Sequence, residues 1–579
     1  MATVADILSP CLVPFPVARR GEGHIVYRAA GLPISESDLL DQYSYAISDA
    51  SPDEMSRKKV FYAERYGGIG MGPHGGGARC GYDGERYHVK GIGPNPLVGY
   101  TEATGQRDGI LTLPLALYEM IWSQILQDKL PFGVVECLAV VAINMSQRPN
   151  CVFDTPIDRG LLIRETYVRP AHFERAAYFK KRPHESVADR SRDVHRVAAM
   201  CQKLPEILRC TFESRVRPEN IVLDGLCELA RRLACQLAFA RSHFLYHSIS
   251  SSNVSLDGRW LDLTSSTLLH TRDCASNPMT VSSWSRFWDQ ESIVMEILTS
   301  LAFHYVKFAR LSDLIYQTWA SEIVAKFTCY LTEASCEYFL CTAGIPPLIA
   351  KTIIRDDEVQ QWAKELQSIL KSNWSKRERQ KHSRNWDAER SLLELSFFPA
   401  SNSPPSTLNL SDDEAVEYHA RRLKVRKLVR NIALENGIPE NQLKIGIALN
   451  SVRFSAEKNE LSYTKMSGDI LNIINNNSRD ANALVREIEM YGDGVAIAGR
   501  FFLGFDYGNV VTCWNDGVLK VSYNMMNDHF MVLFAGVSEE IPRASALGYF
   551  NTNRLGSAMI DFYKKFDALF VFGAGDGGF

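Results

Sequence analysis

Four polar residues in this chain have the types and the order that phosphate chemistry needs. Lys90 follows a glycine-rich segment, and Glu119 lies in an otherwise apolar stretch, LALYEMIW. Asn253 and Asp262 flank a turn at Asp257-Gly258. In phosphoryl-transfer enzymes a lysine orients phosphate oxygens, a helix glutamate holds that lysine, and two oxygen ligands bind magnesium. We therefore predict that these four residues form a catalytic site and that Asn253 and Asp262 are its metal ligands.

Each pair also has a simpler interpretation. Glu119 could be a surface residue of an amphipathic helix, but if it is buried it needs a partner, because an unpaired buried charge is costly. Lys90 would supply that partner. Asn253 and Asp262 could be the polar ends of an ordinary hairpin. If the hairpin closes tightly, its outer ends meet and both oxygens can reach one magnesium ion.

Glycine is concentrated in front of Lys90. Fourteen of the 38 glycines lie between Gly67 and Gly109, in segments that include GGIGMGPHGGGARCG. Glycine allows close backbone approach to a ligand and turns with positive φ. The match to GxGxxG is weak, because no βαβ pattern surrounds it, and the Walker pattern is absent. We expect phosphate contacts from Gly75, Gly76, Gly77 and Arg79, although Arg79 could equally be an exposed loop residue.

Composition excludes several classes of protein. The 579 residues carry a formal net charge of −3, with 46% hydrophobic and 23% charged residues, so no overall field favours nucleic acid. No apolar run is long enough for a membrane span, and the start of the chain lacks the order of a secretory signal. The 13 cysteines include no CxxC pair, which indicates reduced thiols and argues against structural zinc. We expect a cytoplasmic protein.

The patterning predicts mixed structure. Strands are expected at Glu85–Gly93, Val134–Ile143 and Gly160–Ile163, with a helix at Leu113–Gln127. Longer helices are expected later, at Ile221–Tyr246, Gln290–Arg310, Leu314–Thr342, Asp357–Leu370 and Ala415–Glu435. Towards the end of the chain, alternation predicts strands at Val495–Phe505, Asn509–Trp514, Val518–Tyr523 and His529–Ala535. Asn515-Asp516-Gly517 is a hairpin turn signal.

This order predicts an α+β protein with a bilobal, protein-kinase-like fold. Residues 1–165 would form a strand-rich N-lobe with the glycine-rich loop, and residues 166–398 a helical C-lobe. A Ser-, Pro- and acid-rich linker at 399–412 precedes a C-terminal α+β domain, 413–579, whose role in partner or peptide recognition is open.

Residues 62–310 resemble selenoprotein O, a kinase-fold family that transfers AMP from ATP to protein side chains. The similar segments are YHVKGIGPNPLVG from Tyr87, GQRDGIL from Gly105, RETYVRPAHFERAAYF from Arg164, YHSISSSNVSLDGRWLDL from Tyr246, and PMTVSSWSRFWDQESI from Pro278. The resemblance implies ATP and Mg²⁺ or Mn²⁺ as cofactors. It also implies phosphate binding by Arg164 and, with a one-residue shift, by Arg175, and metal binding by Asn253 and Asp262. His247, in the same segment, is expected to be structural.

Two features depart from that family. Asp262 is followed by Leu263-Thr264, so the DYG-like triplet at the second metal ligand is lost. Selenoprotein O has an acid, its expected general base, directly before the metal-binding asparagine, and here that position is Ser252. A hydroxyl nucleophile benefits from a base, whereas a carboxylate is already ionised at neutral pH. The chain could therefore activate a carboxylate as an acyl-adenylate. It could also be a catalytically inactive scaffold that binds ATP and a partner, or a kinase that transfers the γ-phosphate.

The glycine-rich segment with VKGIGPNPLVG also resembles proteins encoded with siderophore-type microcins. In that family such a protein works with an acyltransferase-like partner and modifies the C-terminal end of a precursor peptide. This resemblance implies a peptide or protein substrate and an acyltransferase-like partner protein, in keeping with activation of a peptide C-terminal carboxylate.

Overall fold

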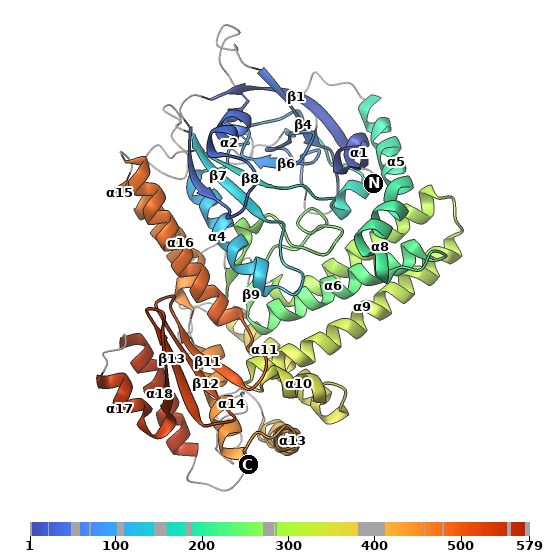
Figure 1. Ribbon diagram of the computed structural model, residues 1–579. Coiled ribbons are helices and arrows are strands. Elements are labelled where there is room, and N and C mark those ends of the chain that lie inside the picture. Colours follow the sequence, from blue (N-terminus) through green and yellow to red (C-terminus); the bar gives the residue numbers. More distant parts are fainter. Residues whose placement is uncertain are drawn as a thin grey trace.

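The computed structural model joins an antiparallel sheet to a large set of helices (Figure 1). The class is mixed α+β, as predicted. The structure describes residues 3–20, 23–47, 58–68, 71–100, 109–143, 159–180, 188–269, 283, 286–379, 396, 411–456, 458–477, 480–552 and 557–573. Residues 399–410 of the predicted linker, and residues 105–108, 278–282 and 284–285 of the segments that resemble selenoprotein O, lie outside this range.

The described part of the N-terminal region contains one sheet with the strand order β2-β7-β8-β6-β5-β4-β1-β3. Every neighbouring pair is antiparallel. The strands are β1 Leu12–Arg19, β2 Gly23–Arg28, β3 Tyr45–Ala46, β4 Lys58–Glu64, β5 Cys80–Tyr82, β6 Tyr87–Lys90, β7 Cys137–Ile143 and β8 Arg159–Glu165. The three strands predicted in this region are confirmed as β6, β7 and β8.

Alternation along the strands places one helix on each face of this sheet. Val140 and Ala142 of β7 share a core with α4 (Leu113–Lys129). The neighbouring Val141 belongs to a second core with Leu39 of α2 (Glu36–Tyr43). Successive strand residues point to opposite faces, so a strand between two helices is apolar throughout. The predicted helix after Leu113 is thus confirmed, with Pro114 in its first turn.

Most of the chain between the N-terminal sheet and residue 379 is helical (Figure 1). A short α1, Val4–Leu8, precedes the sheet. The later helices are α5 Ala188–Phe212, α6 Ile221–Ser242, α8 Gln290–Phe308, α9 Asp313–Thr342, α10 Pro347–Ile353 and α11 Asp357–Arg379. They confirm the four helices predicted between residues 221 and 370. Helix α6 ends four residues before the predicted Tyr246, because Phe244 has a φ of 55° and Leu245–Tyr246 form a short strand, β9, paired with β10 (Thr267–Leu268).

The C-terminal region contains helices and a four-stranded antiparallel sheet within its described part. Its elements are α13 Asp412–Glu435, α14 Glu440–Ser455, α15 Tyr463–Asn476, α16 Ala481–Leu503, β11 Val510–Asn515, β12 Leu519–Asn524, β13 His529–Phe534, β14 Val537–Pro542, α17 Arg543–Thr552 and α18 Ser557–Gly573. The predicted basic helix and the hairpin turn at Asn515–Gly517 are confirmed.

The strand predicted at Val495–Phe505 is wrong, because most of this segment belongs to α16. The alternation in VAIAG is local, whereas Leu484, Ile488, Val495 and Leu503 follow a helical spacing and are buried. Helix α16 packs on α4. A Cβ added at Gly499 would lie 2.7 Å from Ile125, so the two helices approach more closely there than a side chain allows.

Residues on both sides of the linker share hydrophobic cores. Leu484 and Ile488 of α16 belong to the same core as Ile125 of α4. Leu449 of α14 belongs to a second core with Trp362 of α11. Residues 413–579 therefore cover apolar surface of the preceding residues as well as their own.

Arg453 fastens the end of α14 to α16 and β11. It is 2% exposed, and its guanidinium donates to Asp506 at 2.6 Å and to the carbonyl oxygens of Phe501 (2.8 Å), Gly504 (2.7 Å) and Thr512 (3.3 Å). Five donors in a planar fork suit such a cluster of acceptors.

Replacement of Arg453 by Met should therefore destabilise the fold. The change leaves Asp506 and the carbonyl groups without their donor, and we expect a loss of about 3–5 kcal/mol in the free energy of unfolding. Urea unfolding followed by tryptophan fluorescence measures it. Arg217→Met is the control, since that side chain is 62% exposed and pairs with Asp224 on the surface. Equal midpoints for both variants would contradict this role of Arg453.

Candidate functional site

Lys90 and Glu119 form a buried ion pair. Lys90 ends β6, which lies between β5 and β8 in the sheet, and its Nζ is 2.6 Å from Oε2 of Glu119 on α4. Both side chains are 1% exposed. The predicted pairing is present, and the interpretation of Glu119 as a surface residue is wrong.

Asp262, from the hairpin after α6, also contacts Lys90. Its Oδ1 lies 2.7 Å from Lys90 Nζ and 3.0 Å from the guanidinium of Arg164 on β8. The Arg164 guanidinium is also 3.4 Å from Glu119. Asp262 has left-handed backbone angles, φ 61° and ψ 56°, which aspartate tolerates better than most residues. Four of the predicted site residues, Lys90, Glu119, Arg164 and Asp262, thus meet at one point.

A second arginine at this point is Arg169, which the sequence did not indicate. Its guanidinium lies 3.6 Å from Oδ2 of Asp262, stacks on the rings of Tyr66 and Tyr167 and donates to the backbone oxygen of Ser252. Arg164 and Arg169 are five residues apart, and a continuous strand would place them on opposite faces. The chain leaves β8 after Glu165, so this periodicity does not apply.

Arg175, the predicted second phosphate arginine, lies elsewhere. Its side chain is exposed, and it lines a cavity of about 260 Å³ together with Gly67, Gly68, Glu174 and His304. The structure gives it no contact with Asp262 in the described part of the chain. Arg169, not Arg175, lies beside Asp262. Phosphate binding by Arg175 stays a prediction.

The cluster has an excess of positive charge. Lys90, Arg164 and Arg169, each 1% exposed, face the carboxylates of Glu119 and Asp262. Burial alone would raise the pKa of Asp262, but Lys90, Arg164 and Arg169 hold it well below its usual range. Asp262 therefore stays ionised at neutral pH. At 24% it is the most exposed side chain of the five, so the cluster meets solvent at Asp262.

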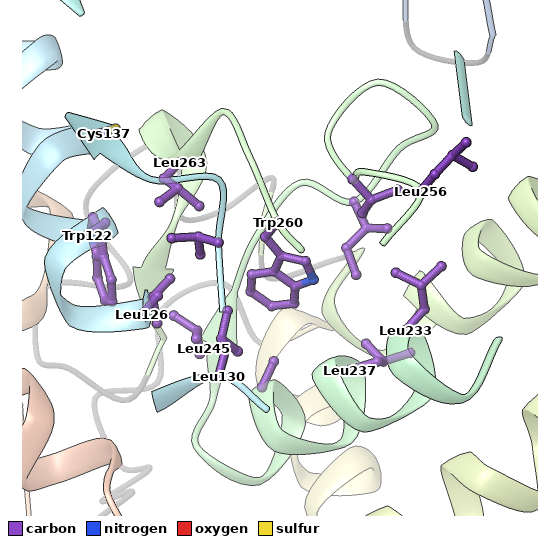
Figure 2. Packing of buried hydrophobic residues seen from close by; sticks show 14 of the residues in the cluster. Trp122, Leu126, Leu130, Cys137, Leu233, Leu237, Leu245, Leu256, Trp260 and Leu263 are labelled. Atoms are coloured by element: carbon purple, nitrogen blue, oxygen red, sulfur yellow. The ribbon is translucent and has the colours of Figure 1, made fainter. Parts of the chain in front are cut away.

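The hairpin that carries Asn253 and Asp262 closes as predicted. Val254 and Trp260 form an antiparallel bridge, and the Leu261 N–H donates to the backbone oxygen of Asn253 at 3.1 Å. Gly258 has a φ of 87° at the turn. Figure 2 shows Trp260 between Leu126 of α4 and Leu130, which directly follows α4, on one side and Leu233 and Leu237 of α6 on the other, which fixes the base of the hairpin.

His247 is buried beneath the same hairpin and contacts it. Its ring stacks on Trp260 with centroids 4.7 Å apart, and its Nε2 lies 3.4 Å from the backbone oxygen of Asn253. Nδ1 lies 3.2 Å from the Ser266 hydroxyl. Burial lowers the pKa of His247 to about 4, so the ring is neutral at physiological pH. These contacts agree with the structural role expected for His247.

Asn253 and Asp262 suit a magnesium ion that is shared with phosphate. The Asn253 Nδ2 donates to the Ser248 oxygen at 2.8 Å, so the side-chain oxygen, which accepts from the Ser252 hydroxyl at 3.3 Å, is the atom that would bind a cation. Magnesium commonly takes one or two protein oxygens and completes its shell with phosphate and water. No group of three His, Cys, Asp or Glu side chains among the described residues is arranged to hold a metal. A metal here would therefore depend on the phosphate oxygens.

Ser252 is surrounded by hydroxyl and amide groups. Its Oγ lies 3.0 Å from the Ser250 Oγ and 3.3 Å from the Asn253 side-chain oxygen. The carboxylate of Glu174 binds the adjacent Ser251 at 2.7 Å, but its other oxygen is bound by Ser300, also at 2.7 Å. Among the described residues, these contacts place no free carboxylate beside Ser252.

The glycine segment is folded against β4. The N–H of Gly75 donates to the Leu97 oxygen at 2.9 Å and that of Gly77 to the Glu64 oxygen at 3.0 Å. A Cβ at Gly76, where φ is 144°, would lie 2.1 Å from the Glu64 oxygen. The N–H groups of Gly75 and Gly77 are thus engaged within the protein in this conformation. Arg79 is half-buried, and its carbonyl accepts from Gly91 and Ile92. Phosphate binding by these four residues stays a prediction.

Comparison of the chain with protein-family models and with curated protein sequences gave no match. Within the part of the chain that the structure describes, no helix has the length and apolar character needed to cross a membrane.

The burial of neutral His247 predicts a specific loss of stability in acid. The unfolded histidine takes up a proton near pH 6.5, whereas the folded residue does so only near pH 4. The stabilisation is complete above pH 6.5 and falls by about 1.4 kcal/mol per pH unit between these values. Urea midpoints measured from pH 7 to pH 4 should therefore fall less steeply for His247→Gln than for the wild type. Parallel curves would contradict the burial of a neutral ring.

Proposed function

We propose that this protein is an ATP-dependent nucleotidyltransferase that transfers AMP to a peptide or protein acceptor. The observation that carries the proposal is the buried cluster of Lys90, Arg164 and Arg169 around Glu119 and Asp262. A site with excess positive charge and limited solvent access favours polyphosphate, because electrostatic interactions are stronger where water is excluded.

The order of the parts supports a kinase-like arrangement. The lysine lies on a central strand of an antiparallel sheet, and its glutamate lies on the helix that crosses the same sheet. The hairpin with Asn253 and Asp262 follows the long helix α6, in the helical part of the chain (Figure 1). In kinase-type enzymes the same order of strand lysine, helix glutamate and two metal ligands spans two lobes.

Each residue then has a defined task. Lys90, oriented by Glu119, and the two arginines would neutralise phosphate oxygens. Asn253 and Asp262 would hold magnesium, which bridges phosphate oxygens and offsets charge that develops on them. Phosphoryl chemistry needs mainly positioning and charge neutralisation, which rigid buried side chains supply.

The environment of Ser252 favours a carboxylate acceptor. A carboxylate oxygen would attack the α-phosphorus of ATP, the bond from that phosphorus to the bridging oxygen would break, and pyrophosphate would leave. The products are an acyl-adenylate and pyrophosphate, and no proton has to be removed. The resemblance to microcin-associated proteins suggests the C-terminal carboxylate of a precursor peptide, handled together with an acyltransferase-like partner protein.

ATP labelled separately at the α- and γ-phosphates tests the reaction. We expect label from the α-phosphate on the acceptor, and a loss of about 10²-fold or more in Lys90→Met and Asp262→Asn. Asp224→Asn is the matched control, because Asp224 is also a partly buried carboxylate bound by an arginine. Transfer of γ-label would show a kinase instead, and full activity in Asp262→Asn would remove the metal assignment.

Exchange of labelled pyrophosphate into ATP tests the acceptor. We expect exchange with a peptide that has a free C-terminus and none with the same peptide amidated at its C-terminus, because the amide cannot form an acyl-adenylate. Equal exchange with both peptides, or with neither across a peptide panel, would contradict a carboxylate acceptor.

A catalytically inactive scaffold is the second candidate. The observation that favours it is the position of Asp262, whose oxygens lie within 2.7–3.6 Å of three cationic side chains. The cluster is thus well paired without a ligand. Binding of magnesium-ATP with no transfer of either label and no exchange would support the scaffold.

A further inference from the structure

Glu64 forms a second buried group beside the cationic cluster. It ends β4 and is 2% exposed, and its Oε2 lies 3.4 Å from Nε2 of His88 and 3.7 Å from Nε2 of His172. Both histidines are fully buried. Neither the two Nε2 atoms nor Oε2 of Glu64 make a hydrogen bond of normal geometry within the described residues, so the contacts at 3.4 and 3.7 Å are electrostatic.

The opposite nitrogen of each ring fixes where its proton lies. Nδ1 of His172 accepts from the backbone N–H of Arg169 at 3.0 Å, so it carries no proton. Nδ1 of His88 lies 3.2 Å from the Tyr167 hydroxyl, which can donate or accept, and 3.4 Å from Nε of Arg164, which can only donate. In a neutral ring the remaining proton is then on Nε2, and in both rings Nε2 faces Glu64. Burial lowers the pKa of both histidines, which keeps the rings neutral.

The same tautomers exclude a metal between these three residues. A histidine that binds a metal offers its lone pair to the ion and donates N–H from its other nitrogen. Here the other nitrogen of each ring accepts a hydrogen bond, so a metal ligand would have to be a fully deprotonated ring. Glu64, His88 and His172 are therefore better described as one acceptor between two donors.

We propose that Glu64 is a positioning residue for the phosphate-binding arginines. Its carboxylate faces both Nε2 atoms and favours the Nε2–H tautomers electrostatically, and the Nδ1 atoms then accept from the Arg164 side chain and the Arg169 backbone. Through its carbonyl oxygen Glu64 also accepts from Gly77, so the residue links the glycine segment to both arginines. This inference rests on the proposed function, because it assigns the arginines to phosphate.

Affinity for two probes tests the positioning role. In Glu64→Leu, which has no acceptor, we expect the Kd for magnesium-ATP and the Kd for inorganic triphosphate to rise together by about tenfold or more. Glu64→Gln keeps an oxygen acceptor and should recover most of the affinity. Glu228→Leu is the matched control, because Glu228 is a buried carboxylate on α6 that binds Arg231 and Arg232. A folded Glu64→Leu protein with wild-type affinities would overturn the proposal, as would an equal loss in Glu228→Leu.

The tautomers give a readout that does not depend on nucleotide. Nitrogen-15 spectra of the histidine-labelled full-length protein, assigned with His88→Gln and His172→Gln, should show both rings as neutral Nε2–H tautomers in the wild type. An Nδ1–H tautomer at either ring would overturn the proposal even if the Glu64 variants fail to fold. If the wild type shows the expected tautomers but binds neither probe, the proposed function fails and the network around Glu64 stands.

Discussion

The buried ammonium group of Lys90 is the constraint on which the site depends. A charge in this position needs partners, and Lys90 has two carboxylates within 2.7 Å. Lys90 comes from the sheet, Glu119 from α4 and Asp262 from the hairpin after α6. One interaction therefore fixes three parts of the chain relative to each other, and the two arginines balance the second carboxylate.

Much of this arrangement could be predicted from the sequence because it depends on local rules. A lone acid in an apolar helix needs a cation, which identified Glu119 and Lys90. A tight glycine turn brings together the ends of its strands, which identified Asn253 and Asp262. The position of Arg169 depends on a change of chain direction after β8, which no local pattern encodes. The contacts of His88 and His172 with Glu64 were also not predicted, because they join segments that are distant in the sequence.

The glycine-rich segment has a different explanation from the one that its composition suggests. Gly76 leaves room for the Glu64 carbonyl, and the N–H groups of Gly75 and Gly77 bind oxygens of the chain itself. Glycine is needed here for close packing of the segment against β4. For Gly75 and Gly77 to bind phosphate through their N–H groups, these groups would first have to leave the oxygens of Leu97 and Glu64.

The packing of α16 on α4 has a consequence for how the protein matures. Arg500 reaches the carbonyl of Gln124 across 376 residues of sequence. At ribosomal rates of about 5–20 residues per second, roughly 20–75 s pass between the synthesis of these two residues. During that interval the face of α4 that later packs on α16 is not yet covered by that helix. We expect the Lys90–Glu119 pair to become rigid only after synthesis of the chain is nearly complete, so a nascent chain would not yet hold the cationic cluster in its final arrangement.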